Sequence, residues 1–344
     1  MKIPYRKTHK TLSEQADLLQ SRGLDCGSRE AAMQILHDYS YYTLSAYWYP
    51  FRRMLEKDEP RETSWQYRAS TFLPKAKLAD AVAIANFDQK LRAVLFVGLA
   101  QLELSLRFQL AYVLGMRSPF AHTMQEHLDQ KECCALPSKK FEKQYSNNFD
   151  HWLDLYDKQI SRSKSEDFIQ HFTAKYSSEV PIWMAVEVLD FGSLVRLFKL
   201  LKGADQTEIS RRFGVSNGRL FHGVLYGLGI LRNHVAHHNR VWNRRLSASL
   251  RHLPAGVVGD EVSHLQDMKD TNRSKLYPWV SILANSLKTY SPTTNWHRTF
   301  ATQFQKFPAV AIIEGYAQMA APPGWRQFEL WTSTPAKDGV ITVA

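Results

Sequence analysis

The amino-acid sequence predicts an all-α protein, a helical bundle with further helical segments appended at its N- and C-terminal ends. Long stretches repeat apolar residues at steps of three and four, and few stretches show the alternation typical of a half-buried strand. Apolar side chains make up 44% of the 344 residues, which is enough to form a sizeable core. A chain of this composition is expected to fold rather than to stay disordered.

Predicted helices follow one another along most of the chain. A first amphipathic helix is predicted for residues 11–23, where Gly23 would end it. The clearest helix covers residues 78–114, and its apolar stripe consists of Phe87, Leu91, Val94, Leu95, Leu102, Leu106 and Leu110. A strongly apolar segment covers 183–201, and further helices are predicted at 152–164, 207–213, 218–238 and 274–290. Residues 56–70 and 120–150 are polar and are expected to be loops, the second with short helices.

Three parts of the chain are expected from this pattern. Residues 1–72 form an N-terminal helical, aromatic-rich segment packed on the core, and residues 73–245 form the helical core itself. Residues 246–344 form a C-terminal helical extension and tail, in which Trp296, Trp325 and Trp331 are expected to anchor the chain to the body.

Aromatic residues are concentrated between positions 30 and 53, at Tyr39, Tyr41, Tyr42, Tyr47, Trp48, Tyr49 and Phe51. We favour a place in the core for these rings. The alternative is that some of them stack on nucleic-acid bases, with Tyr47 and Trp48 as the candidate rings and Arg52 as a neighbouring cation.

The charge balance indicates a polyanionic partner. The formal net charge is +11 and the isoelectric point is about 9.4, which favours nucleic acid ahead of an anionic membrane surface. Cys26, Cys133 and Cys134 lack the spacing of a zinc site and are expected to be reduced thiols. The N-terminus has no apolar signal region, and we find no run of about eighteen apolar residues. We therefore expect a cytoplasmic protein without a membrane partner.

The sharpest motif is Arg232-Asn-His-Val-Ala-His237-His238-Asn-Arg240-Val-Trp242-Asn243, which continues the apolar helix of residues 220–231. Arg232 and His237 are five positions apart, so on one straight helix they diverge by about 140°. They can share a site only in a cleft bordered by the helix, or where two helix ends meet. Arg117 and His122 have the same spacing, but Pro119 lies between them, so we treat that match as accidental.

Three chemistries compete for this motif. His234 and His238 have the i, i+4 spacing of two zinc ligands, but no third ligand stands at a fixed offset. Surface histidines at a helix C-terminus would also be favoured by the helix dipole. RNA cleavage accounts best for the residue types, because an imidazole can move a proton near neutral pH and a guanidinium stabilises the charge of a phosphorane-like transition state. We predict no metal and no other cofactor.

The motif and several other segments resemble the Abi-like (AbiD/AbiF-type) proteins of bacterial phage defence. The resemblance extends over most of the chain. Its segments are Gln15 through Arg22-Gly23-Leu24, Tyr41-Tyr42-x-Leu44-Ser45-x-Tyr47-Trp48-Tyr49-Pro50-Phe51-Arg52, Phe87-Asp88-x-x-Leu91-Arg92, Glu103-x-x-x-Arg107, Pro181-x-Trp183, Phe191-Gly192 and Arg232-Asn233-x-x-Ala236-His237-His238-x-Arg240-x-Trp242-Asn243.

This family is similar to the HEPN superfamily, and the resemblance implies a HEPN-like bundle, usually dimeric, that acts as a metal-independent endoribonuclease. The motif arginine and histidine fall on Arg232 and His237, and the polar residue after the arginine falls on Asn233. An acidic residue on an earlier helix, here Glu103, would orient the motif arginine. His238, Arg240 and Arg107 are the expected additional RNA contacts, and a small structured RNA is a possible controlling partner, as in a toxin–antitoxin system. Gln101 and Leu102 depart from the family pattern, in which an extra acidic residue is common.

Two functions from different classes remain open at this point. One is a catalytic ribonuclease effector of abortive infection. The other is an RNA-binding or RNA-sensing module of a defence or toxin–antitoxin system, in which Arg232 and His237 hold phosphates without cutting. Incubation of the protein with labelled RNA would discriminate between them, because only the first creates new RNA ends.

Overall fold

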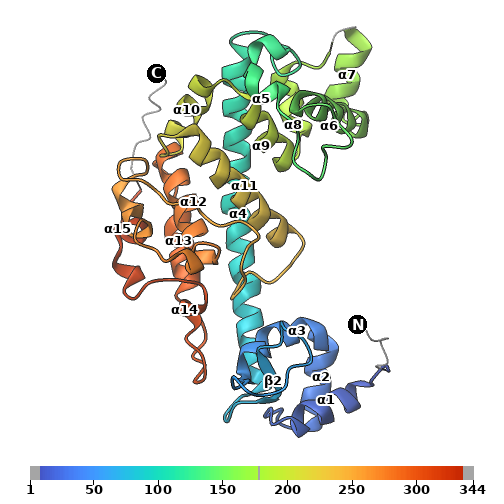
Figure 1. The fold of residues 1–344 in the computed structure, drawn as a ribbon, viewed down its shortest axis with the longest axis vertical. Helices are drawn as coiled ribbons and strands as arrows, with labels where there is room; N and C mark the ends of the chain where they lie inside the picture. Colours follow the sequence, from blue (N-terminus) through green and yellow to red (C-terminus); the bar gives the residue numbers. More distant parts are fainter. Residues whose placement is uncertain (1–7, 177–178, 336–344) are drawn as a thin grey trace.

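A computed structural model describes residues 8–176 and 179–335 of the chain. It is mostly helical, and its helices gather around one long central helix, α4 (Leu78–Gly115), which extends through much of the molecule (Figure 1). The predicted helix over residues 78–114 is thus confirmed almost to the residue. Its buried face contacts helices from all three parts of the chain.

The N-terminal part lies at one end of α4 (Figure 1). It consists of α1 (Leu12–Ser21), α2 (Arg29–Tyr39), α3 (Tyr41–Trp48) and a short 3-10 turn, η1 (Tyr49–Phe51), before a hairpin of β1 (Arg52–Met54) and β2 (Arg68–Phe72). The two strands are antiparallel, and Arg52 pairs with Phe72. This hairpin was not predicted, because β1 is too short to show an alternating pattern and β2 follows a polar loop.

Thr11 is the N-cap of α1 and forms a capping box with Glu14. Its hydroxyl accepts a hydrogen bond from the backbone of Glu14, whose carboxylate in turn accepts from the Thr11 backbone N–H at 2.7 Å. Ala16 and Leu19 form the buried side of this helix. The predicted amphipathic helix at residues 11–23 is therefore confirmed, with its end two residues earlier.

The middle of the chain covers the far end of α4 and part of its side (Figure 1). Its helices are η2 (Gln125–His127), α5 (Gln130–Cys134), α6 (Asn148–Arg162), α7 (Asp167–Lys175), α8 (Ile182–Val188), α9 (Phe191–Leu200), α10 (Gly203–Arg212) and α11 (Gly218–Ala236). The apolar segment 183–201 therefore forms two helices. Asp190 separates them, because its carboxylate accepts from the backbone of Ser193 at 2.7 Å and begins α9.

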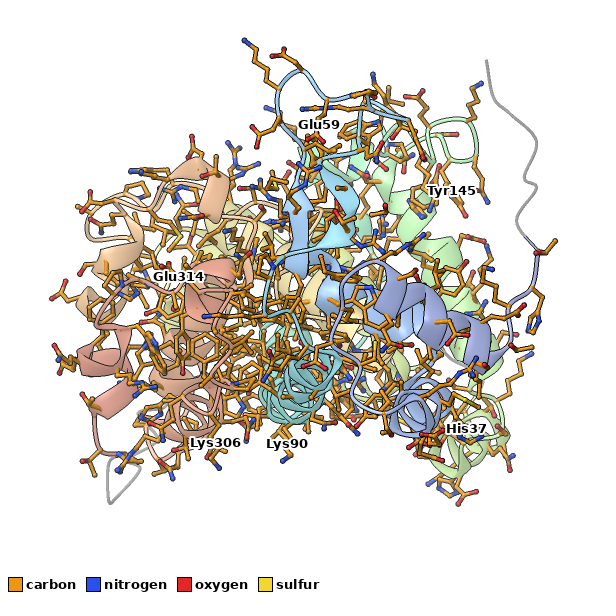
Figure 2. The ribbon with its side chains drawn as sticks, turned by 90° about the horizontal axis from the view of Figure 1, so that it is seen from below. His37, Glu59, Lys90, Tyr145, Lys306 and Glu314 are labelled. Atoms are coloured by element: carbon orange, nitrogen blue, oxygen red, sulfur yellow. The ribbon has the colours of Figure 1, made fainter. Side chains whose placement is uncertain are left out.

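The C-terminal part packs alongside α4 and α11. It contains η3 (Asp260–Leu265), η4 (Asp270–Asn272), α12 (Leu276–Tyr290), α13 (Trp296–Phe304), α14 (Gly315–Gln318), η5 (Trp325–Gln327) and α15 (Glu329–Thr332). Trp296, Trp325 and Trp331 are all buried, as predicted. Seen from below, Lys90 and Lys306 lie at the rim of the molecule (Figure 2).

Two glycines allow the C-terminal helices to approach closely. A Cβ atom on Gly98 of α4 would lie 2.3 Å from the Trp296 ring, and one on Gly227 of α11 would lie 2.0 Å from the Trp279 ring. Both contacts are shorter than side chains tolerate, so only glycine fits while the tryptophans stay in place. These contacts fix α12 and α13 against the two helices that carry the site described below.

Among the described residues, α4 is long and apolar enough to cross a membrane by length and composition alone. We had found no such run, because Gln101, Glu103 and Arg107 interrupt the apolar residues. The finding is weak evidence for a membrane span, since core helices meet the same criterion and α4 packs against helices from all parts of the chain.

Candidate functional site

Helix α11 carries the Arg–x4–His motif to its C-terminal end. The Asn217 side chain caps its start by accepting from the Leu220 backbone at 2.9 Å, and Val224, Leu228 and Leu231 face the core. The helix ends at Ala236, and His237 is the capping residue, whose backbone N–H donates to Asn233 at 3.0 Å. Arg232 therefore lies in the last turn, while His237 lies beyond it.

A left-handed residue reverses the chain directly after His237. His238 has φ 55°, a conformation that favours glycine, and the Asn239 N–H donates back to the His234 carbonyl at 2.9 Å. Because the helix stops here, His237 is not held to the direction that a straight helix would give it. Asn233, His237 and His238 are exposed, and 34% of the Arg232 side chain is exposed.

Glu103 of α4 lies between two arginines. Its Oε2 is 3.5 Å from Nε of Arg232, and its Oε1 accepts from Nη2 of Arg107 at 2.8 Å. Only 12% of the Glu103 side chain is exposed, so its charge is well shielded from water. At this distance the contact is an ion pair rather than a short hydrogen bond, and it places a shielded carboxylate beside the Arg232 guanidinium. The structure thus brings Glu103 and Arg232 together, and the orienting role that the resemblance implies for Glu103 stays a prediction.

The Arg107 guanidinium makes several hydrogen bonds within the protein. Besides Glu103, it donates to the backbone carbonyls of Glu187 and of Leu189, the latter at 3.0 Å, where α8 gives way to α9. Of its side chain, 15% is exposed. Arg107 therefore positions Glu103 and the α8–α9 link, and its predicted contact with RNA stays a prediction.

The chain after the motif is fixed by a buried aspartate. Asp88 of α4 accepts hydrogen bonds from the backbone N–H groups of Val241 at 3.1 Å and Trp242 at 2.6 Å, from the Tyr47 hydroxyl at 2.8 Å, and from Arg92. Burial raises the pKa of Asp88, while Arg92 and these hydrogen bonds oppose the shift. Asp88 thus joins α3, α4 and the segment directly after His237 and His238.

Sequence reasoning missed Asp88, because an aspartate and an arginine four residues apart on a helix usually form an exposed pair of little energetic weight. Asp88 is instead fully buried. A signal was present in the sequence: Asp88 stands three residues before Leu91 and seven before Leu95, on the apolar face of α4. A charge in such a stripe needs partners, which here come from distant parts of the chain.

Several residues expected to contact RNA are buried. Tyr47 and Trp48 are 4% and 0% exposed, and Trp242 stacks on Tyr47 with ring centroids 6.3 Å apart. Neither Tyr47 nor Trp48 can stack on a base in this structure, so their assignment to RNA binding is corrected to core packing. Arg240 donates to the Ala46 carbonyl, and burial lowers its pKa, so it tethers the motif segment to α3.

Arg52 lies half-buried at the start of β1, 5.9 Å from the Tyr49 ring centroid and 5.8 Å from that of Phe72. Its strand belongs to the N-terminal part, which the motif segment meets at α3 through Arg240 and Trp242. The residues predicted for one site therefore separate into two groups. Arg232, Asn233, His237, His238 and Glu103 gather around the end of α11, whereas Arg52 belongs elsewhere.

The metal alternative rested on His234 and His238. Within residues 8–176 and 179–335, no three His, Cys, Asp or Glu side chains gather in a way that could hold a metal ion. His234 is partly buried, and burial lowers its pKa, with smaller contributions from Arg244 and His237. His238 lies beyond the end of α11 and has a left-handed backbone conformation. The side chains of His234 and His238 are therefore not related by the i, i+4 geometry of a continuous helix.

Exposed apolar side chains lie on the helices that carry the site, a feature that the sequence did not predict. On α4, Phe96, Val97, Leu104, Phe108 and Tyr112 are between 37% and 61% exposed, as are Trp183 of α8 and Tyr226 of α11. Leu104, Phe108, Tyr112 and Trp183 line one cavity together, and we call these four residues the apolar face. This cavity, of about 480 Å³ between α4 and α8, is also lined by Arg107, so the apolar face reaches the Glu103–Arg107 pair.

These features define a mostly helical protein in which an arginine and a histidine stand at the exposed end of a core helix. The chain belongs to the Abi-like protein family, whose sequence model matches residues 34–243 and so covers more than half of it. The match ends at Asn243, the last residue of the motif, and includes α4 and α11. No curated protein and no solved structure gives a significant match. Membership in this family suggests a role in abortive-infection phage defence.

Proposed function

We propose that this protein is an abortive-infection effector that cleaves RNA without a metal ion, with Arg232 and His237 as its catalytic residues. The observation that carries the proposal is the shielded carboxylate of Glu103 beside Arg232, at the end of a helix whose next residue is the exposed His237. The charge of the whole chain, +11, suits an RNA substrate. We expect this reaction to take place in the cytoplasm.

The proposed reaction is an attack of a ribose 2′-OH on the adjacent phosphorus. A base removes the 2′ proton, the new P–O bond forms, and the bond from phosphorus to the 5′-oxygen breaks as an acid protonates that oxygen. The products are a 2′,3′-cyclic phosphate and a 5′-OH end. His237 supplies a proton-transfer group, Arg232 stabilises the charge on the phosphoryl oxygens, and Asn233 is an exposed neighbouring hydrogen-bond donor.

One chain offers one histidine at the motif position, whereas the reaction needs both a base and an acid. We therefore propose a two-fold dimer that brings two copies of the α11 end together. Such an interface is self-complementary. The apolar face supports this part of the proposal, because monomeric proteins seldom expose so many large apolar side chains beside one another. Tyr226 of α11 is also exposed, and it lies on the helix that would form the interface.

A site formed by residues of both chains of the dimer is a composite site, and mixing two inactive variants tests it. Arg232→Ala and His237→Ala chains should each be inactive alone, and mixed heterodimers should regain part of the cleavage activity. Tyr226→Asp should shift the protein toward monomer by light scattering, while Tyr67→Asp, at an exposed tyrosine of the N-terminal part, serves as the matched control. A monomer that cleaves RNA at the full rate would rule out the composite site.

The second candidate function is RNA binding or sensing without cleavage, in which a small structured RNA would be the bound regulator. The half-exposed Arg232 and the exposed His238 favour it as much as they favour cleavage, because both can contact phosphates. Sequencing the RNA that co-purifies with His237→Ala protein would identify a bound regulatory RNA. New RNA ends produced by the wild-type protein alone would decide for the catalytic function.

A further inference from the structure

A second candidate site lies in the N-terminal part of the chain, and neither Arg232 nor His237 lines it. A cavity of about 710 Å³ opens between α1, α2 and α3, the three helices at the end of α4 in Figure 1. Leu18 and Leu36 contribute apolar lining, and Tyr41 and Tyr42 contribute aromatic rings. A volume of this size is in the range of small-molecule sites and is large enough for a nucleotide.

The charged groups that line this cavity are all basic. Lys10 and Arg22 line it, and no aspartate or glutamate does so among the described residues. Of the acidic residues of α1, Asp17 pairs with Arg29 at 2.6 Å, while Glu14 accepts from the Thr11 backbone and lies close enough to Lys10 for that charge to help lower its pKa. The sequence has the same bias, because the first thirteen residues contain four lysines and arginines and no acidic residue.

Arg22 is held in place without an acidic partner. It donates to the Tyr41 hydroxyl at 3.4 Å and forms no ion pair within the described part of the chain. Arg52 lies nearby, and its buried Nε has no hydrogen-bond partner there. Burial, and to a smaller extent the charge of Arg22, lowers the pKa of Arg52. Two guanidinium groups without a carboxylate create a local positive potential that an anion would neutralise.

The two tyrosines differ in their freedom to bind a ligand. Tyr41 packs edge-on against the buried Trp48, with ring centroids 5.1 Å apart, and is therefore fixed. Tyr42, 6.0 Å from Tyr41, is 80% exposed. An exposed ring beside a cationic wall is the combination that proteins use to stack a base and hold the phosphate next to it.

We propose that this cavity binds one nucleotide of a single-stranded RNA, with its base against Tyr42 and its phosphate at Arg22 and Lys10. The identity of the ligand as RNA rests on the proposed function of the protein. The cavity would hold an RNA strand apart from Arg232 and His237. Mutation of the cavity residues would therefore weaken RNA binding without removing a catalytic group. A free nucleotide offers the same base and phosphate as a nucleotide within an RNA strand, and competition between the two distinguishes them.

Binding is measured with full-length His237→Ala protein, which should leave the RNA intact. The probe is a fluorescein-labelled, eight-nucleotide, single-stranded RNA followed by fluorescence anisotropy. We expect Tyr42→Ala and Arg22→Gln each to weaken binding by about five- to a hundredfold, the range found for one stacked base. Tyr67→Ala and Arg29→Gln are matched controls, because they change an exposed tyrosine and an exposed arginine outside this cavity.

A 4-thiouridine version of the same RNA should cross-link under ultraviolet light to Tyr41 or Tyr42, and uridine monophosphate should compete only at much higher concentration. Unchanged affinity in Tyr42→Ala, or cross-links that fall only outside this cavity, would overturn the proposal. If uridine monophosphate bound as tightly as the RNA, the cavity would be a free-nucleotide site and the RNA assignment would be wrong. Cleavage by wild-type protein is scored separately, so a failure here is distinguishable from a failure of the nuclease.

Discussion

Glu103 and Arg232, which are 129 positions apart in the sequence, lie with Oε2 3.5 Å from Nε. The carboxylate belongs to the longest helix of the fold, and the guanidinium belongs to the last turn of α11. Because Arg107 holds the other carboxylate oxygen at 2.8 Å, Glu103 cannot turn away from this position without breaking that contact. Arg232 thus lies beside a carboxylate that is itself held in place.

Replacing Glu103 by glutamine tests the orienting role predicted for it. Glu103→Gln keeps the size of the side chain but removes the charge between the two arginines. We expect cleavage to fall by up to about a hundredfold, since small errors in the position of a reacting group have effects of that size. Glu187→Gln is the control, because Glu187 meets Arg107 at 3.8 Å from an exposed position. Equal activities of the two variants would exclude an orienting role for Glu103.

The buried Asp88 is expected to be important for stability. The Asp88 carboxylate accepts hydrogen bonds from two backbone N–H groups, from the Tyr47 hydroxyl and from Arg92. In Asp88→Asn, one of its oxygens becomes an NH2 group, which donates instead of accepting and carries no charge. Breaking a buried charged network typically costs about 3–5 kcal/mol. Urea unfolding should show a loss of this size, whereas Tyr47→Phe, which removes one of the hydrogen bonds, should cost about 1 kcal/mol. A stability of Asp88→Asn equal to that of wild type would mean that the network contributes little.

Buried histidines make the fold sensitive to acid. Burial lowers the pKa of His122 from 6.5 to about 4. The unfolded chain therefore binds a proton at this residue below about pH 6.5, while the folded chain does not. The contribution of His122 to stability is fully present above that pH and is lost progressively as the pH falls toward 4.

We expect His122→Phe to reduce the loss of unfolding free energy between pH 7.5 and pH 5 by about 2 kcal/mol, because it removes this proton-linked term. Urea titrations of both proteins at the two pH values measure it. The control is His37→Phe, at an exposed histidine, which should keep the pH dependence of wild type. If all three proteins lose the same stability on acidification, His122 is not buried in its neutral form.

Affinity for RNA should depend strongly on salt. Each phosphate neutralised on a single strand contributes about 0.7 to the slope of log affinity against log salt concentration. The chain carries a net charge of +11, so we expect a slope of several times that value, measured with the eight-nucleotide RNA between 50 and 200 mM salt. A slope near zero would indicate that the positive charge serves a partner other than nucleic acid.

Much of the fold could be predicted from local patterns. The apolar stripe of α4 is continuous, so its bounds were predicted almost to the residue. The break between α8 and α9 was missed, because Asp190 was treated as part of an apolar run rather than as the cap of a new helix. The β1–β2 hairpin was missed for a similar reason, since a three-residue strand carries almost no periodic signal.

The candidate site was predictable only in part. Arg232 and His237 could be named from the motif, and Glu103 from the resemblance to a family. The roles of Tyr47, Arg107 and Arg240 could not be predicted, because they depend on partners far away in the sequence: Asp88, the Leu189 carbonyl and the Ala46 carbonyl. Residue type gives the chemistry that a side chain can perform, but whether it faces solvent or the interior is decided by tertiary packing.

The central claim is that Arg232 and His237 cleave RNA without a metal ion. The most direct measurement follows end-labelled RNA with purified wild-type, Arg232→Ala and His237→Ala proteins in the presence of EDTA, and identifies the new ends by mass spectrometry. Wild type should produce 2′,3′-cyclic phosphate and 5′-OH ends, and none where the ribose is replaced by deoxyribose. Each variant should be slower by about a hundred- to ten-thousandfold while remaining folded, as expected for loss of a proton-transfer or charge-stabilising group. Full activity in folded His237→Ala protein, or 3′-OH and 5′-phosphate ends that disappear with EDTA, would contradict the claim.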